Sequence, residues 1–230
     1  MMNKYRISRS SVQFLLLLVV SLCLWLPMQT AAAEMPVSEI AKKLQESYNK
    51  ITSLQASFVQ ETYSKLSSRK RTGNGSLVLV KPGLMRWDYQ APDVQVFICD
   101  GERLSMYFAK ENQMFTSSAK QYLESDVMYS FFAGSANISR DFDVLESTET
   151  EQDIDETTFQ MRLIPKTMHP QIDEITVWVD RSSYLLSRLK VVDKFGSITD
   201  MIFSDIVENQ KVDRSRFAFT PPAGTEIINQ

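Results

Sequence analysis

This sequence has little cysteine and histidine and no excess of positive charge. Its 230 residues include two cysteines and one histidine, too few to fill a zinc site made of four cysteine or histidine ligands. Twenty-five lysines and arginines stand against 28 acidic residues, a formal net charge of −3, and the only basic cluster is Arg69–Arg71. A chain without a positive field is not expected to bind nucleic acid through the phosphate backbone.

The sequence also lacks the common catalytic motifs. It contains no G-x-S-x-G nucleophile elbow, no H-E-x-x-H zinc motif, no C-x-x-C pair and no phosphate-binding P-loop. The single histidine, His169, stands in a turn-like segment and is expected to be solvated. The adjacent carboxylates Asp173 and Glu174 lie on a predicted strand and therefore point to opposite faces. We expect a protein that is not an enzyme and that holds no metal and no cofactor.

The first 33 residues have the pattern of a secretory signal peptide. A short basic segment contains Lys4, Arg6 and Arg9, residues 12–26 are almost uninterruptedly apolar, and a run of three alanines ends at Ala33. That apolar run is shorter than the roughly twenty residues needed to span a bilayer, so cleavage is favoured over a membrane anchor. Cleavage after Ala33 leaves 197 residues and changes the net charge from −3 to −6, because three positive charges and no negative ones are removed.

The two cysteines indicate whether the protein is anchored to a membrane by a lipid and whether it can form a disulfide. Cys23 lies inside the apolar run after the bulky Leu22, whereas an acylated cysteine needs a small residue before it at the cleavage point. We therefore expect an untethered protein. Cys99 then has no partner for a disulfide within the chain, and the apolar run Val94–Cys99 predicts a buried, unreactive thiol.

The rest of the chain predicts one helix followed by a meander of strands. Ser38 is a candidate N-cap for an amphipathic helix of about thirteen residues. The apolar face of this helix comprises Ile40, Leu44, Tyr48 and Ile51. Ten later segments have strand character, and Asp100-Gly101 is typical of a tight hairpin. The ten segments are 58–63, 76–80, 85–89, 94–99, 104–108, 142–145, 159–163, 175–179, 184–192 and 198–207.

A second helix is predicted among the strands. Residues 126–133 follow the candidate cap Ser125, end at Gly134 and are nearly all apolar. The acidic stretch 146–156 is expected to be a solvated hairpin tip. Because the sequence has no linker composition and no internal repeat, residues 34–230 are expected to form a single domain. The predicted fold class is α+β, mainly β: an antiparallel sheet of about ten to eleven strands with two helical insertions.

One side of the predicted sheet is rich in large and flexible apolar side chains. These residues are Met85, Trp87, Tyr89, Met106, Phe108 and Met161. They occupy alternating strand positions, so on each strand they share one side of the sheet. Two interpretations remain open. The residues form an ordinary core covered by the two helices, which composition alone favours, or they line an apolar pocket that the helices roof without filling.

Three segments of the sequence carry a resemblance to one known family. They are residues 54–60 (LQASFVQ), residues 75–101, which contain KPGLMRWDY and end at Asp100-Gly101, and residues 217–224 (FAFTPPAG). In their order and spacing they resemble the LolA family of periplasmic outer-membrane lipoprotein carriers. The resemblance covers essentially the whole of the predicted mature chain.

The resemblance implies a fold and a function. The implied fold is an incomplete, half-open antiparallel β-barrel with a helical lid over a hydrophobic cavity. The implied protein is a soluble, monomeric periplasmic chaperone that is not embedded in a membrane. It takes acylated lipoproteins from an inner-membrane ATP-driven release complex and delivers them to an outer-membrane receptor. Two alternatives stay open: a receptor or envelope-stress sensor domain of the same fold, and an unrecognised hydrolase.

The resemblance also implies a cavity wall and a latch. The implied wall residues are Ile40, Leu44, Met85, Trp87, Tyr89, Met106, Phe108, Val127, Met128, Phe131 and Phe132. Family members place an arginine before the proline of a strand turn, where it hydrogen-bonds to the lid and holds the cargo-free form closed. Here that position is Lys81, which lacks the planar guanidinium fork. Two interpretations of Lys81 remain open: it acts as a latch, or it is a solvated lysine in a turn. Ser105 is a second departure, at a place where an aromatic residue is common.

Overall fold

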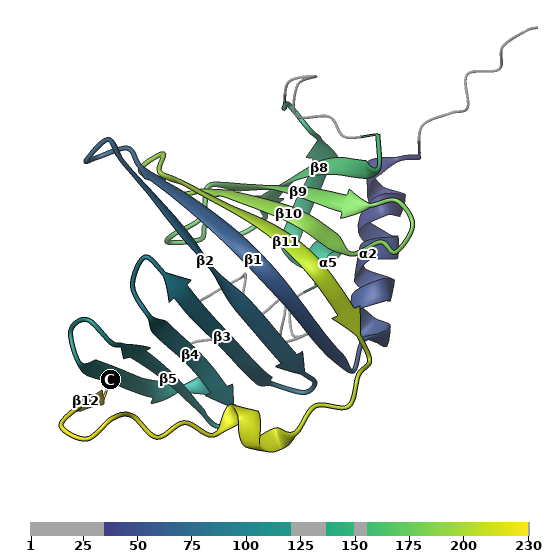
Figure 1. The fold of residues 1–230 in the computed structure, drawn as a ribbon. Coiled ribbons are helices and arrows are strands. Elements are labelled where there is room, and N and C mark those ends of the chain that lie inside the picture. The colour runs from purple at the N-terminus through teal and green to yellow at the C-terminus, as the bar shows by residue number, and fades with distance from the viewer. Residues whose placement is uncertain (1–34, 121–136, 150–155, 230) are drawn as a thin grey trace, which may run out of the picture. The chain divides into compact units, whose positions relative to one another are not determined.

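A single open sheet of twelve strands dominates the computed structural model, which describes residues 35–120, 137–149 and 156–229 (Figure 1). Its elements are α2 (Val37–Lys50), β1 (Ser53–Ser64), β2 (Arg69–Val80), β3 (Leu84–Ala91), β4 (Gln95–Asp100), β5 (Arg103–Phe108), β6 (Gln113–Ser118), α5 (Ile138–Asp141), β7 (Phe142–Glu146), β8 (Thr158–Pro165), β9 (Glu174–Asp180), β10 (Leu186–Val192), β11 (Ile198–Glu208), the 3₁₀ helix η3 (Arg214–Phe217) and β12 (Glu226–Asn229). The strand order is β12-β6-β5-β4-β3-β2-β1-β11-β10-β9-β8-β7. Strands β12 and β7 are the two edges, so the sheet is not closed.

All ten predicted strand segments are confirmed, and two strands were missed. Strand β6 carries Met114 and Thr116 on one face and Phe115 on the other, so its sequence does not alternate between apolar and polar residues. Strand β12 has four residues and pairs with β6 in parallel, whereas every other neighbouring pair is antiparallel. The predicted strand count of ten to eleven was therefore too low. The pairing of β12 could not be read locally, because it joins segments about 110 residues apart in sequence.

Helix α2 has the predicted apolar face but not the predicted start. Ile40, Leu44 and Tyr48 are buried, as expected. The helix begins at Val37 after Pro36, whose carbonyl accepts hydrogen bonds from the backbone N–H groups of residues 39 and 40. No side chain caps this end, and proline suits it because the first N–H groups of a helix lack intrahelical partners. The predicted helix at 126–133 lies outside the described residues. In the described ranges, no helix is both long and apolar enough to cross a membrane.

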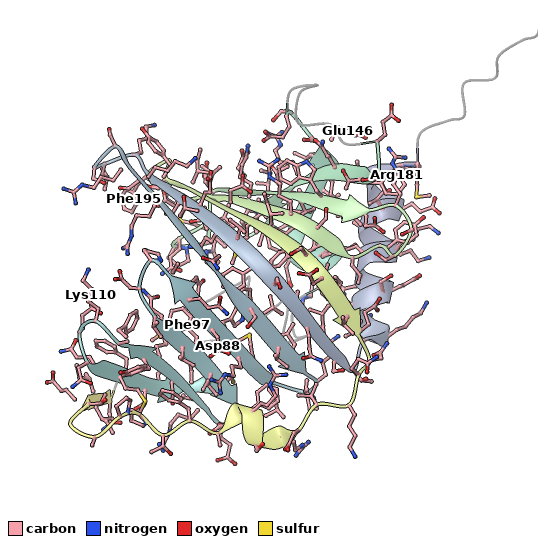
Figure 2. All side chains as sticks on the ribbon, in the orientation of Figure 1. Asp88, Phe97, Lys110, Glu146, Arg181 and Phe195 are labelled. Atoms are coloured by element: carbon pink, nitrogen blue, oxygen red, sulfur yellow. The ribbon has the colours of Figure 1, made fainter. Side chains whose placement is uncertain are left out.

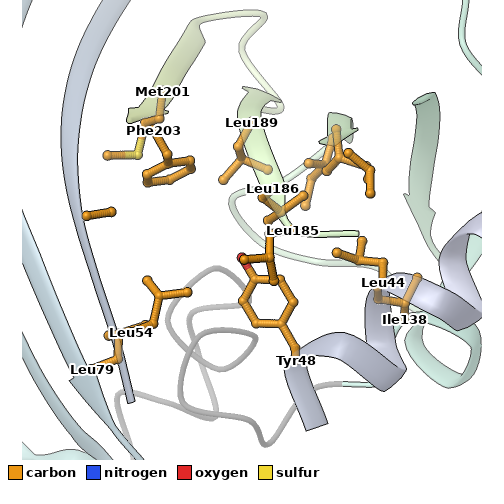
Figure 3. Packing of buried hydrophobic residues seen from close by; sticks show 14 of the residues in the cluster. Leu44, Tyr48, Leu54, Leu79, Ile138, Leu185, Leu186, Leu189, Met201 and Phe203 are labelled. Carbon is orange, nitrogen blue, oxygen red and sulfur yellow. The ribbon is translucent and has the colours of Figure 1, made fainter. Parts of the chain in front are cut away.

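The face of the sheet toward α2, here called the inner face, forms the main hydrophobic core. Leu44 and Tyr48 of α2 pack with Leu185 and Leu186 at the start of β10, and Ile138 of the short helix α5 joins them (Figure 3). The α5 backbone is tied to α2 as well, because the Ile138 N–H donates to the Gln45 side chain at 3.0 Å. Helices α2 and α5 thus pack together and cover core residues of β7–β11.

The opposite, outer face is covered at strands β2–β6 by the C-terminal segment. Val78, Val96, Ile98, Tyr107 and Met114 form a second buried cluster beneath Phe217, with Val212 and Phe219 packed against it. The Arg86 side chain holds Asp88 through two hydrogen bonds and donates a third to the Arg216 carbonyl of η3 at 2.8 Å. Arg86, on the polar side of the alternating strand β3, therefore anchors this covering segment.

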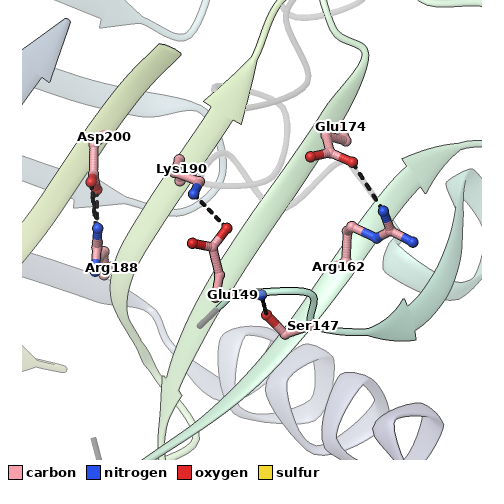
Figure 4. A network of polar contacts seen from close by, with 7 residues as sticks. All are labelled: Ser147, Glu149, Arg162, Glu174, Arg188, Lys190 and Asp200. Atoms are coloured by element: carbon pink, nitrogen blue, oxygen red, sulfur yellow. Dashed lines mark hydrogen bonds and ion pairs between the residues drawn. The ribbon is translucent and has the colours of Figure 1, made fainter. Parts of the chain in front are cut away.

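Ion pairs occupy the outer face of strands β8–β11. Arg188 pairs with Asp200 at 2.7 Å, Arg162 pairs with Glu174 at 3.4 Å, and Lys190 pairs with Glu149 (Figure 4). The Glu149 side chain is only 16% exposed and reaches β10, three strands from β7. The described start of the acidic stretch, 146–149, therefore lies against the sheet. The prediction of a solvated tip is wrong for Glu149, because a lysine on the sheet offsets its charge.

Gly75 is a position where a side chain cannot be accommodated. A Cβ atom there would lie 2.0 Å from the Asp88 carbonyl oxygen and 2.9 Å from the Phe58 ring. We expect Gly75→Ala to lower the free energy of unfolding by about 3 kcal/mol, because the backbone and the ring must both move. Urea denaturation measures this. Ser76→Ala on the same strand is the control and should change stability by less than about 0.5 kcal/mol; similar losses for both variants would contradict this account of Gly75.

Candidate functional site

Seven aromatic rings make a continuous series of contacts across the inner face. From one end to the other they are Phe203, Trp87, Phe58, Tyr89, Phe97, Phe108 and Phe115, here called the aromatic row. Successive ring centroids are 6.5, 5.2, 4.9, 5.5, 5.8 and 5.9 Å apart. Their planes are tilted or edge-to-face, the arrangement that aromatic pairs prefer. The row is a broad apolar surface that crosses seven strands, from β11 to β6, and every one of them except β2 supplies a ring.

Strand register places these rings on one face. Trp87 on β3 pairs with Phe97 on β4, Phe97 pairs with Met106 on β5, and Met106 pairs with Phe115 on β6. Directly paired residues of neighbouring strands point to the same side, so the four side chains share the inner face. At the other end, the Phe58 ring of β1 lies over Gly75 of β2. Because Gly75 has no side chain, the ring can reach Tyr89 on β3.

Burial changes along the aromatic row. Phe203, Trp87 and Phe58 are 7%, 0% and 2% exposed and belong to the core. Tyr89, Phe97, Phe108 and Phe115 are only half-buried, and Phe97 is labelled on the ribbon in Figure 2. One end of the row is therefore closed core, and the other end presents apolar surface that a ligand can cover. Such a surface suits an apolar ligand that has no single required orientation.

The predicted wall residues divide into the same two groups. Ile40, Leu44, Met85 and Trp87 are core residues, at most 3% exposed, whereas Tyr89, Met106 and Phe108 are half-buried on the inner face. Val127, Met128, Phe131 and Phe132 lie outside the described residues. That any of these residues contacts a ligand stays a prediction.

Sequence reasoning missed two half-buried members of the aromatic row. Phe97 stands in a continuous apolar run, where alternation does not reveal which side chains share a face. Phe115 belongs to β6, the strand that was not predicted. Ser105, by contrast, pairs with Ile98 and Thr116 on the outer face. Its difference from the family pattern therefore leaves the inner face unchanged.

Lys81 joins the sheet to helix α2. The residue lies in the turn between β2 and β3, and its ammonium donates a hydrogen bond to the Tyr48 carbonyl in the last turn of the helix. The same oxygen accepts the Ile51 N–H at 3.2 Å. A cation is favourable at a helix C-terminus. Burial lowers the pKa of Lys81. Lys81 is thus half-buried with a defined partner and is not a solvated turn lysine, while its role as a latch stays a prediction.

Cys99 and His169 are the thiol and the imidazole of the described residues, and neither has the surroundings of a catalytic group. Cys99 is 1% exposed on the inner face, and burial raises the pKa of its thiol. His169 was expected to be solvated, but its Nδ1 accepts hydrogen bonds from the backbone N–H groups of Gln171 and Ile172, at 3.3 and 3.1 Å. The imidazole therefore stabilises a turn. The thiol is confirmed as a buried group.

Comparison with known proteins identifies the family. The protein-family model described as outer membrane lipoprotein carrier protein LolA matches residues 49–220. This chain belongs to the LolA family. An outer-membrane lipoprotein carrier protein of Nitrosomonas europaea is 30% identical over 94% of this chain and 98% of its own length. A protein of the same name from Legionella pneumophila is 26% identical over 83% of this chain and 90% of its own.

A solved structure resembles the fold. The crystal structure of an uncharacterized conserved protein from Thermus thermophilus superposes with a TM-score of 0.52 at 10% identity and covers 84% of this chain and 98% of that one. At this identity the likeness concerns the fold alone. It agrees with the open, mainly antiparallel sheet with few helices described above.

The thiol of this LolA-family chain should be inert while the protein is folded. Cys99 is buried and its thiolate is disfavoured, so we expect a disulfide reagent at pH 8 to modify it at least about 100-fold more slowly in the folded protein than in urea. The chain from Glu34 onward is used, because it contains Cys99 and not Cys23. Equal rates in the two states would contradict the burial of Cys99.

Proposed function

We propose that this protein is a soluble periplasmic carrier of acylated lipoproteins that acts as a monomer. It takes them from an inner-membrane ATP-driven release complex and delivers them to an outer-membrane receptor. Residues 1–33 act as a cleaved signal peptide in this proposal, and residues 34–230 form the carrier domain. The observation that carries the proposal is the aromatic row with its half-buried end, in a chain of the LolA family.

The physical chemistry of acyl chains supports this use of the inner face. Each methylene group removed from water contributes about 0.8 kcal/mol, so covering about ten of them stabilises a complex by some 8 kcal/mol. That is enough to keep an acylated protein in solution during transfer. Tilted rings accept chains of different length and position, because they supply apolar contact without directional hydrogen bonds. The same lack of directional contacts permits release.

A carrier of this kind needs no catalytic group. Cys99 is buried, His169 supports its own turn, and the half-buried end of the aromatic row consists of apolar side chains apart from the Tyr89 hydroxyl. The Tyr89 hydroxyl donates to the Gln60 side chain at 2.8 Å. We therefore assign the protein a binding and transfer role without chemistry of its own, and no cofactor or metal.

Lys81 is the proposed latch between the cargo-free and loaded forms. Its hydrogen bond to Tyr48 holds the β2–β3 turn against the C-terminal end of α2. In this proposal, the loaded form moves the helix away from the sheet, so the contact lengthens or breaks. The contact then favours the cargo-free form and helps to expel the ligand at the receptor.

The half-buried rings are tested by shortening them. We expect Phe97→Ala and Phe108→Ala each to weaken binding of a fluorescent fatty-acyl probe about tenfold, because each removes roughly 1.5 kcal/mol of apolar contact. Ile202→Ala on the outer face is the control, since that side chain is 51% exposed and lies on the other side of the sheet. Fluorescence titration gives the three affinities. Equal affinities for all three variants would contradict a ligand on the inner face.

The latch is tested by Lys81→Leu against Lys81→Arg. Loss of the charged donor to Tyr48 should lower the free energy of unfolding by about 1.5 kcal/mol and slow lipoprotein transfer to the receptor, because the cargo-free form is no longer favoured. Arginine keeps a donor and should preserve both properties. Transfer is measured as the lipoprotein found on the receptor after mixing. Unchanged transfer for Lys81→Leu would show that the contact is only structural.

A further inference from the structure

Three connections lie together at one end of the sheet. They are the β1–β2 turn at 65–68, the β8–β9 loop at 166–173 and the β10–β11 turn at 193–197. Register places them there: Tyr63 pairs with Ile198, and Val192 pairs with both Ile198 and Glu174. The first and last turns also touch, because the Lys65 N–H donates to the Ser197 hydroxyl at 3.3 Å.

The most exposed large apolar side chains project from these three connections. Met168 is 95% exposed, Leu66 81% and Phe195 67%; the next value among the described residues is 53% for Ile227 on the edge strand β12. Figure 2 labels Phe195 at this end of the sheet. Scattered exposed apolar residues are ordinary, but here the three highest values occur on three neighbouring connections.

These side chains stand on ordered turns. The Asp193 carboxylate accepts the N–H groups of Phe195 and Ser197, each at 2.8 Å. His169 holds the loop that presents Met168 through the two backbone hydrogen bonds described above. The apolar groups are therefore presented to solvent by fixed backbone, and covering them costs little further ordering.

Basic side chains stand close to Leu66 in the β1–β2 turn and at the start of β2. Lys65 and Arg69 flank Leu66, and neither has an ion-pair partner among the described residues. Two of the acidic neighbours, Glu61 and Asp173, are each offset by a lysine, at 2.6 Å from Lys70 and 2.7 Å from Lys194. The third, Asp193, accepts hydrogen bonds from backbone N–H groups of its own turn. Although the chain as a whole is acidic, this end offers unpaired positive charge next to exposed apolar groups.

We propose that this end of the sheet docks on the surface of a bilayer containing anionic phospholipid. Leu66, Met168 and Phe195 enter the region between headgroups, and Lys65 and Arg69 meet lipid phosphates. A bilayer fits better than a folded protein partner, because the three side chains project from three different connections. A protein would need three matching pockets, whereas a bilayer admits each side chain independently. The inference concerns a surface apart from the aromatic row and does not depend on the proposed carrier function.

Vesicle binding tests the proposal. The chain from Glu34 onward is used, because every described element and both hydrophobic clusters lie in the compact unit that begins at Met35. It is mixed with vesicles of phosphatidylethanolamine and phosphatidylglycerol in a 3:1 ratio, about 25% anionic lipid, or with phosphatidylcholine alone, and sedimented. We expect binding to the anionic vesicles, weakened by added salt, and about tenfold less binding to the neutral ones.

Matched triple variants identify the contact. Leu66→Thr, Met168→Thr and Phe195→Thr together should reduce the anionic partition coefficient at least about tenfold. Ile202→Thr, Val207→Thr and Ile227→Thr remove three exposed apolar side chains elsewhere and should leave binding unchanged; equal urea midpoints confirm that both variants fold. If the unmutated chain does not sediment with anionic vesicles, the proposal is overturned. Impaired lipoprotein transfer by the first triple variant would in that case point to a protein partner. Equal loss in both triple variants also overturns it.

Discussion

Apolar side chains on both faces of strands β2–β6 are the constraint on which the rest of the structure depends. Alternation places Val78, Ile98 and Tyr107 on the outer face and Met85, Phe97 and Met106 on the inner one, so each face needs its own cover. The C-terminal segment covers the outer face with Phe217 and is held by the Arg86 hydrogen bond. That segment is part of the same chain, so its cover is permanent.

The inner face is covered unequally. Helices α2 and α5 close the core over β7–β11, whereas the rings of β4–β6 remain half-buried. Lys81 lies where these regions meet and binds the C-terminal turn of α2. An exchangeable ligand thus has apolar surface to cover on the inner face, while the permanent cover on the outer face keeps the sheet intact. In the function proposed above, this asymmetry connects the fold to the carriage of acyl groups.

Local patterns in the sequence predicted what depends on local alternation. The apolar face of α2, the ten strands and the Asp100-Gly101 hairpin follow from periodicity and turn chemistry. Contacts between distant segments were not predictable in this way: β12 pairs with β6, Phe217 covers the outer face, and Glu149 reaches Lys190. Phe97 was missed because a strand with apolar residues on both faces does not show which side each one takes. The resemblance drew attention to 217–224, but that Phe217 covers the outer face could be seen only in the structure.

The central claim is that the inner face binds acyl chains, and native mass spectrometry of the chain purified from the periplasm tests it most directly. The account predicts a population with one triacylated lipoprotein bound per chain and a mass that begins at residue 34, without an N-terminal lipid. A chain that carries its own acyl group would instead support a receptor. A chain recovered only without lipid, or only with unacylated polypeptides, would contradict the account.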